Sequence, residues 1–162
     1  MIRNANITDA ESIVKINIAN WKITYKNIFP DDLLNNIESK LNDSILKCQN
    51  KINEYIVYVK DNKVVAFLRY GINKKDYDSS YAEIYALYVD KDYQGLGIGK
   101  SLVDYITKLL KNDFKYILVS TLKENSANAF YQKVGFKKIG NCEFELANKK
   151  YLENLYQIEI SK

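Results

Sequence analysis

The segment YAEIYALYVDKDYQGLGIGKSLVDYI, residues 81–106, passes from a strand pattern to a helix pattern through a glycine-rich turn. Residues 81–90 are rich in aromatic and branched side chains, which is typical of a β-strand. After the turn, apolar residues recur at helical spacing, namely Leu102, Val103, Ile106, Leu109 and Leu110. The sequence therefore predicts a strand, a glycine loop and a helix in direct succession.

The glycine loop, QGLGIGK at residues 94–100, is of a kind that binds anions. Glycine lets the backbone approach a ligand closely, and the free amides at a helix start point toward phosphate oxygens. A plain tight turn between strand and helix is the alternative. Three glycines within residues 95–99 favour anion binding over it.

Two familiar phosphate-binding motifs do not fit this loop. The P-loop pattern needs a glycine five positions before its Gly-Lys pair, and that position is Gln94. The dinucleotide fingerprint needs a third glycine at position 100 or 102, where the chain has Lys100 and Leu102. Both classes of nucleotide site are poor matches.

The rest of the chain predicts an α+β fold with a mixed sheet. Strand patterns cover residues 2–6, 54–60, 64–72, 115–120, 136–146 and 151–160, and helix patterns begin near residues 8, 30, 42 and 126. Thr8 and Glu11 fit a capping box at the first helix, and Pro30 fits the start of the second. We expect about seven strands and about four helices in a single domain over residues 1–162.

The composition excludes several kinds of chemistry. The chain has 24 basic and 20 acidic residues, a formal net charge of +4 and no histidine. Without histidine there is no Ser-His-Asp relay and no His-based metal site. Cys48 and Cys142 stand far apart, which favours two free thiols and no metal centre.

The partners of the chain are constrained in the same way. Only Arg3 and Arg69 are arginines, so a nucleic-acid surface is disfavoured. No apolar run approaches the ~18 residues of a membrane span. The first dozen residues lack the apolar stretch of a signal peptide. We expect a soluble, cytoplasmic protein, whose charge balance would suit a small anionic ligand without requiring one.

The loop and a second segment together resemble the Gcn5-related N-acetyltransferase (GNAT) superfamily. Gln94, Gly97 and Gly99 match every fixed position of its Gln/Arg-x-x-Gly-x-Gly/Ala pattern. Downstream, ENSANAFYQKVGF resembles the second signature of the family through Asn125, Ala127, Phe130, Tyr131, Gly135 and Phe136. The resemblance extends over nearly the whole chain, from the first expected strand to the last.

The resemblance implies acetyl-CoA as the acetyl donor. In the family, the strand before the loop holds the pantetheine arm through main-chain groups, here near Leu87, Tyr88 and Val89, where a β-bulge is expected. The loop would then cradle the pyrophosphate with Gln94, Gly95, Leu96, Gly97, Ile98, Gly99 and Lys100. Asn125 and Asn128 complete the implied cofactor-binding set. No metal is implied.

Tyr131 is implied as the general acid. A phenol with a pKa near ~10 and a thiol near ~8.5 are close enough for a proton to pass to the departing thiolate. Tyr131 is one of fourteen tyrosines, so an ordinary core tyrosine is the alternative.

Glu83 is the leading candidate for the base. It shares strand parity with Tyr85, so both side chains should point to one side. An unpaired carboxylate inside an apolar strand is costly, which calls for an explanation. An exposed glutamate near the strand end is the alternative, and Tyr85 would assist Glu83 or replace it.

The acceptor site is implied to involve the segment NWKITYKNIFPDDLL, residues 20–34. Trp21, Tyr25 and Phe29 recur every four residues, which fits either a buried helix face or an aromatic wall around an amine. We expect direct acetyl transfer to a small amine or polyamine. A peptide or protein amino group, charged tRNA and a non-catalytic acyl-CoA-binding module are the rivals, and a homodimer is compatible with the family.

Overall fold

A computed structural model describes residues 1–161, and the chain divides into two compact units. The first unit consists of Met1–Arg69 and Ala86–Leu102, and the second of Tyr70–Tyr85 and the residues from 103 onward. The division falls within two strands and one helix, which each contribute residues to both units. The expected single domain over residues 1–162 stays a prediction.

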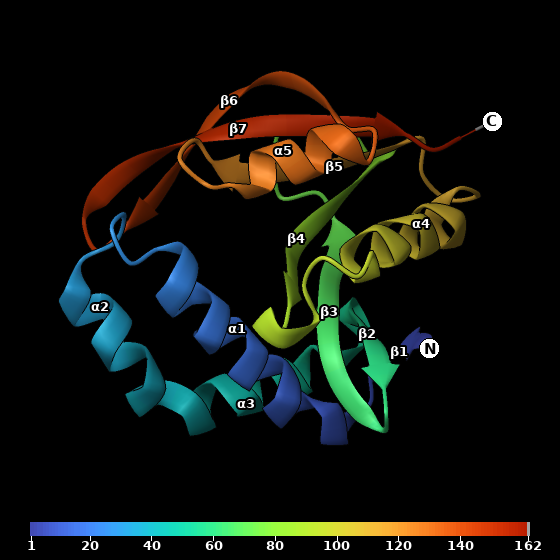
Figure 1. Ribbon diagram of the computed structural model, residues 1–162. Coiled ribbons are helices and arrows are strands. Elements are labelled where there is room, and N and C mark those ends of the chain that lie inside the picture. The colour runs from blue at the N-terminus through green and yellow to red at the C-terminus, as the bar shows by residue number, and fades with distance from the viewer. Residues whose placement is uncertain (162) are drawn as a thin grey trace. The chain divides into compact units, whose positions relative to one another are not determined.

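Seven strands form one mixed sheet in the order β1-β2-β3-β4-β5-β7-β6 (Figure 1). The pair β4–β5 is parallel, whereas β1–β2, β2–β3, β5–β7 and β6–β7 are antiparallel. The expected mixed sheet of an α+β fold is confirmed. The strands are β1 (Ile2–Asn4), β2 (Tyr55–Lys60), β3 (Lys63–Ile72), β4 (Tyr81–Val89), β5 (Tyr116–Leu122), β6 (Lys137–Leu146) and β7 (Lys149–Glu159).

Five α-helices accompany the sheet in residues 1–161, because the segment near residue 42 forms a helix of its own. They are α1 (Ala10–Thr24), α2 (Asp31–Asn36), α3 (Leu41–Asn50), α4 (Ile98–Leu110) and α5 (Ala127–Lys133). Pro30 is the N-cap of α2, as its sequence predicts. No helix within the described part of the chain is long and apolar enough to cross a membrane.

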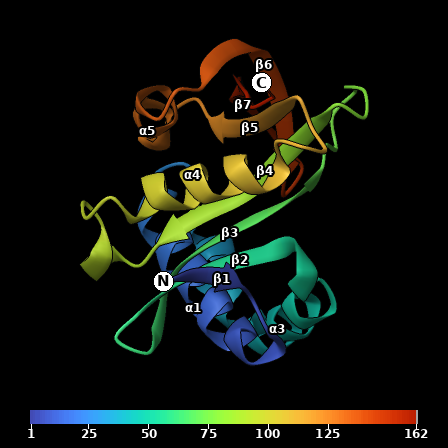
Figure 2. The same cartoon turned by 90° about the vertical axis from the view of Figure 1, so that its right-hand side faces the viewer.

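In the first unit, α1 and α3 lie side by side next to strands β1 to β3 (Figure 2). Their apolar faces pack against these strands. Ile13 and Val14 of α1 form one buried cluster with Val57 of β2 and Phe67 of β3. Cys48 of α3 belongs to this core as a buried free thiol. This packing gives α1 a fixed position beside the strands.

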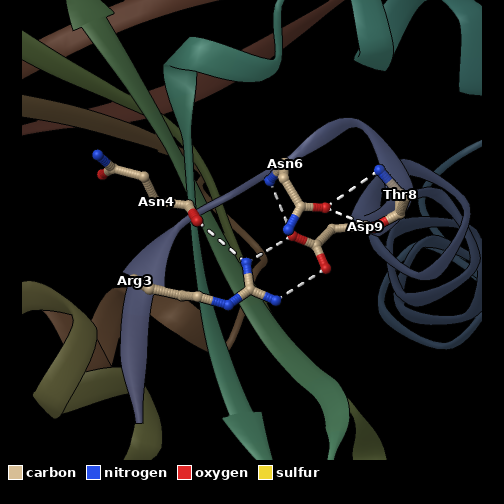
Figure 3. A network of polar contacts seen from close by, with 5 residues as sticks. All are labelled: Arg3, Asn4, Asn6, Thr8 and Asp9. Carbon is tan, nitrogen blue, oxygen red and sulfur yellow. Dashed lines mark hydrogen bonds and ion pairs between the residues drawn. The ribbon is translucent and has the colours of Figure 1, made fainter.

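The start of α1 differs from the sequence prediction. The capping box is formed by Asn6, the N-cap of a short 3-10 turn (Ile7–Asp9), and Asp9, the last residue of that turn, and not by Thr8 and Glu11. Asn6 Oδ1 accepts from the Thr8 amide at 3.1 Å, and Asp9 accepts from the Asn6 amide at 2.8 Å (Figure 3). Arg3 pairs with both Asp9 oxygens at 2.7 and 3.0 Å, which ties β1 to the helix start. The turn before the helix moves the cap two residues upstream.

In the second unit, α5 lies beside the strands β5, β7 and β6 (Figure 1). Ala147 and Asn148, both with positive φ, form the tight turn between β6 and β7.

Asp61 and Asn62, also with positive φ, form the turn between β2 and β3 that the sequence predicts. In α4, the apolar residues are buried as expected, namely Leu102, Val103, Ile106 and Leu110. Leu109 is the exception and is 42% exposed, because it lies at the edge of the apolar face.

Candidate active site

The glycine loop follows β4 and opens α4. Gly95 and Gly97 have φ angles of 75° and 78°, in the left-handed region that favours glycine. No atom lies within 4 Å of where a side chain would begin at either residue, so backbone conformation and not crowding explains these glycines. Ile98, only 4% exposed, anchors the start of α4 beneath the loop. The loop between Gln94 and Gly97 thus faces solvent on a fixed base.

The carbonyl of Val89, at the end of β4, accepts two side-chain hydrogen bonds. Gln94 Nε2 donates to it at 3.0 Å, and Asn20 Nδ2, from α1, donates at 3.2 Å. A cofactor contact to this oxygen would therefore have to displace one of them. Asn20 was not predicted as a functional residue, because its only signal in the sequence is an amide on the apolar side of a helix.

Trp21, Tyr25 and Phe29 come together as the sequence predicts. Their ring centroids lie 4.6 to 5.5 Å apart, and Tyr25 Oη lies 3.3 Å from Tyr88 Oη on β4. Tyr25 and Phe29 are 8% and 4% exposed, so their rings contribute to the core, whereas Trp21 is half-buried. The cluster thus serves packing and leaves Trp21 as its most accessible member.

Glu83 is buried, with 5% exposure, which removes the alternative of an exposed strand-end glutamate. Its Oε2 accepts from the Lys74 amide at 2.7 Å, and its Oε1 lies 3.4 Å from the ammonium of Lys75. Both lysines belong to the segment between β3 and β4. The carboxylate is therefore charge-paired within its own unit.

Tyr85, two residues further along β4, also meets this segment. Its hydroxyl donates to the carbonyl of Ile72, and the Lys74 ammonium lies 4.0 Å from its ring centroid. A Cβ at Gly71 would lie 2.6 Å from the Tyr85 hydroxyl oxygen, so only glycine lets the ring lie here. Glu83 and Tyr85 thus each have a lysine ammonium beside them, that of Lys75 at Glu83 and that of Lys74 at Tyr85.

A second carboxylate, Glu153 of β7, was not predicted from the sequence. It lies opposite Cys142 in the β6–β7 register, and the Cys142 thiol donates to it at 3.8 Å. Burial raises the pKa of Glu153 above its usual range, and the nearby Lys75 opposes that shift. Lys75 is therefore electrostatically linked to two carboxylates, on β4 and β7.

Tyr131 lies in α5 and is 6% exposed. Its ring packs edge-on against Phe130 and Phe136, with centroids 5.2 and 5.5 Å apart. Gly135, with φ of 107°, ends the helix and lets the Phe136 amide bond the Tyr131 carbonyl at 2.9 Å. The second signature therefore fixes the position of the Tyr131 ring.

The side-chain amide of Asn128 makes hydrogen bonds to several segments of the second unit. Its Nδ2 donates to the carbonyls of Leu122, Lys123 and Asn125, at 3.0, 3.3 and 2.6 Å. Its Oδ1 accepts from Asn154 and Tyr156 at 2.9 and 2.8 Å. These bonds account for the amide, so its expected cofactor contact gains no support from them. Asn125 accepts from the Ala127 amide at 2.9 Å and so helps begin α5.

Residues 51–138 match the family model described as an acetyltransferase (GNAT) domain. The chain belongs to the GNAT family. This match spans the glycine loop, Glu83 and Tyr131, so the parts that carry the resemblance in sequence lie inside the matched region. As a GNAT enzyme, the protein is an acetyl-CoA-dependent N-acetyltransferase.

Relatives of this GNAT enzyme cover most of its length. It is 25% identical over 153 residues to an uncharacterized N-acetyltransferase, YuaI, of Bacillus subtilis, covering 94% of this chain and 88% of that protein. It is 27% identical to a spermidine N(1)-acetyltransferase of Thermoplasma acidophilum, covering 84% of this chain and 87% of that one. The solved PaiA N-acetyltransferase of T. acidophilum, in complex with coenzyme A, has the same fold, with a TM-score of 0.76, 23% identity and 98% coverage of both chains.

The glycine loop has the properties needed to bind the pyrophosphate of coenzyme A. A pyrophosphate needs several amide donors and a backbone that it can approach closely. Gly95 and Gly97 provide that backbone, with open space where side chains would stand, at the start of α4. Both arginines hold carboxylates, Arg3 with Asp9 and Arg69 with Glu54, so the phosphate contacts expected here are amides and lysines.

Proposed function

We propose that this enzyme transfers acetyl to a primary amine of a small cationic acceptor, a polyamine or another small amine. The observation that carries this acceptor class is the pair of ammonium groups on Glu83 and Tyr85. Both residues are expected to face the acceptor, and both hold a cation supplied by the chain itself. The spermidine substrate of the T. acidophilum relative supports the same class.

The proposed chemistry is direct transfer in a ternary complex. The acceptor reaches the site as an ammonium, and Glu83 removes one proton from it, directly or through water. The neutral nitrogen then forms the amide bond as the carbon–sulfur bond of the thioester breaks. Tyr131 gives its proton to the departing thiolate, and the acylated nitrogen releases its second proton, through solvent, to restore the Tyr131 hydroxyl. Glu83 returns its proton to water, and no covalent acyl-enzyme is formed.

The proposed cofactor contacts follow the order of the chain. The main chain at Leu87 and Val89 holds the pantetheine arm through groups other than the Val89 carbonyl, which accepts from Asn20 and Gln94. The bulge expected there stays a prediction. The amides from Gly95 to Lys100 hold the pyrophosphate. Tyr25 and Tyr88, joined through their hydroxyl groups, support the wall of the acceptor site, and Trp21 forms its accessible part.

A lysine side chain of a peptide or protein is the second candidate acceptor. The group on Glu83 is itself a lysine ammonium, so the same observation accommodates this substrate. The two candidates differ in what surrounds the reacting amine, because a peptide brings a backbone and a polyamine brings a second cation.

The experiment is an assay of acetyl-CoA-dependent thiol release against spermidine, spermine, amino sugars, amino acids and lysine-containing peptides. Turnover with polyamines above peptides supports the proposal, and the reverse order supports the second candidate. Firm acetyl-CoA binding without turnover on any amine would contradict both and favour a non-catalytic acyl-CoA-binding module.

Tyr131→Phe tests the acid in the same assay, with Tyr156→Phe as its matched control. The ring centroids of these two buried tyrosines lie 6.4 Å apart, and the Tyr156 hydroxyl donates to Asn128 Oδ1 at 2.8 Å. Loss of a general acid should lower kcat by about tenfold or more in Tyr131→Phe. Tyr156→Phe should keep kcat and lose stability. Equal kcat in both variants would remove Tyr131 from the mechanism.

A further inference from the structure

Asn20 lies in the second half of α1, on its buried side, where an apolar residue would be expected, and only 7% of it is exposed. A buried amide costs free energy unless its donor and acceptor are satisfied. Asn20 Nδ2 donates to Ile16 O, one turn back, at 3.0 Å and to Val89 O at 3.2 Å, and Oδ1 faces Gln94 Nε2 at 3.4 Å. Two of these three contacts leave the helix and reach the segment that leads into the glycine loop.

The contacts close a small ring of hydrogen bonds. Gln94 Nε2 also donates to Val89 O at 3.0 Å, so Asn20, Val89 and Gln94 are each bonded to the other two. Val89 is the last residue of β4, and Gln94 is the first residue of the loop. The ring thus holds together both ends of the connection that crosses residues 90–93.

The far end of the loop is fixed by different means. The amide and hydroxyl of Ser101 both donate to Gly97 O, at 3.0 and 3.1 Å, and Ile98 is buried below. Between these two anchors stand Gly95 and Leu96, and Gly95, with φ of 75°, is of the residue type with the greatest backbone freedom. Ordering such a segment on a ligand costs entropy, and anchoring its ends in advance lowers that cost.

We infer that Asn20 is a positioning residue for coenzyme A binding, acting from α1 through Val89 and Gln94 on the glycine loop. This inference rests on the proposed role of the loop in holding the pyrophosphate.

The test measures the dissociation constant of coenzyme A by titration calorimetry on the full chain. Asn20→Ala should weaken binding about tenfold through loss of preorganisation, and raise the KM for acetyl-CoA with kcat within about twofold. The matched control is Asn17→Ala, a half-buried asparagine on the same helix, which should bind coenzyme A as the parent does. Parent-like affinity in Asn20→Ala would overturn the inference.

Two further variants keep the test decisive. Asn20→Asp retains the side-chain volume and an acceptor toward Gln94 but replaces the donor to Val89, so it should also weaken binding, even where Asn20→Ala does not fold. In a double-mutant cycle with Gln94→Ala, the two losses should be less than additive, because both act through one ring of bonds. Fully additive losses would contradict the ring.

The outcome separates this inference from the role of the loop. Gly97→Val places a side chain where φ is 78° and should abolish coenzyme A binding if the loop holds the pyrophosphate. Loss in Gly97→Val with parent-like binding in Asn20→Ala would overturn the role of Asn20 alone. Parent-like binding in Gly97→Val would overturn the proposed role of the loop, and the inference with it.

Discussion

The ammonium of Lys75 lies 3.4 Å from the carboxylate of Glu83, and only 5% of Glu83 is exposed. The preceding residue, Lys74, donates its amide to the other oxygen of the same carboxylate and extends its own ammonium over Tyr85. One short segment thus brings two cations to the two residues on β4 that are proposed to meet the acceptor. A cationic acceptor has to compete with them.

Removing the competing cation should therefore favour the acceptor. In Lys75→Gln we expect the KM for a polyamine to fall about threefold or more, with kcat nearly unchanged, because the incoming ammonium no longer displaces one. Steady-state kinetics with spermidine measure this. Lys63→Gln, an exposed lysine at the start of β3, is the control. A KM that stays constant or rises would show that Lys75 does not occupy the acceptor position.

Glu83→Gln tests the proposed base. The variant should lose about tenfold or more in kcat near neutral pH. The deficit should shrink as the pH rises toward the pKa of the amine, because the acceptor then loses its proton without help. A pH–rate profile measures this, and Glu153→Gln, on β7, is the comparison. A larger loss in Glu153→Gln would transfer the role of base to Glu153.

Gly71→Ala should displace the Tyr85 ring, which is proposed to face the acceptor. The new Cβ would stand 2.6 Å from the Tyr85 hydroxyl oxygen and 3.1 Å from its ring, so the ring must move. We expect a several-fold rise in the KM for the amine and a loss of about 1–3 kcal/mol in the free energy of unfolding. Gly140→Ala, where a Cβ meets nothing within 4 Å, is the matched control. Equal kinetics in the two variants would argue against a role for Tyr85.

Asn128→Ala separates structural from cofactor-binding roles of this amide. Loss of its bonds to three carbonyls, Asn154 and Tyr156 should lower the free energy of unfolding by about 3 kcal/mol, because buried groups are left unsatisfied. The folded variant should bind coenzyme A with the affinity of the parent. Calorimetry that shows a large loss of affinity for coenzyme A in the folded variant would support the cofactor role predicted for Asn128.

Acid should weaken the Arg3–Asp9 link. The hydrogen bonds from Arg3 hold the pKa of Asp9 below its usual range, so its contribution to stability is complete above the unfolded pKa near ~4 and is lost as the pH falls through the folded pKa. In urea unfolding at pH 7, Asp9→Asn should lose about 2 kcal/mol, and the difference from the parent should narrow at pH 3. Glu11→Gln, in an exposed pair with Lys15, should change little at either pH.

Local patterns predicted much of this protein. The strand–loop–helix succession around residues 81–106, the turn at Asp61 and Asn62, and the start of α2 at Pro30 all follow from periodicity and turn chemistry that neighbouring residues decide. The motif at Gln94, Gly97 and Gly99 indicated the family, and the match of residues 51–138 to the family model shows it. The cap of α1 was placed wrongly, since Thr8 and Asn6 both have cap chemistry and the preceding turn decides between them.

The partners of buried polar groups depended on the tertiary structure. Asn20 and Val89 stand 69 positions apart, and Asn128 and Tyr156 stand 28 apart. No local pattern brings such residues together, because strand order and helix packing decide which side chains meet. The sequence by itself determined the elements, the glycine loop and the family. Only the tertiary structure decided that Glu83 is paired with Lys75 and that the Asn128 amide is bonded to Asn154 and Tyr156 of β7. It also decided that Asn20 of α1 is hydrogen-bonded to Val89 and Gln94 beside the glycine loop.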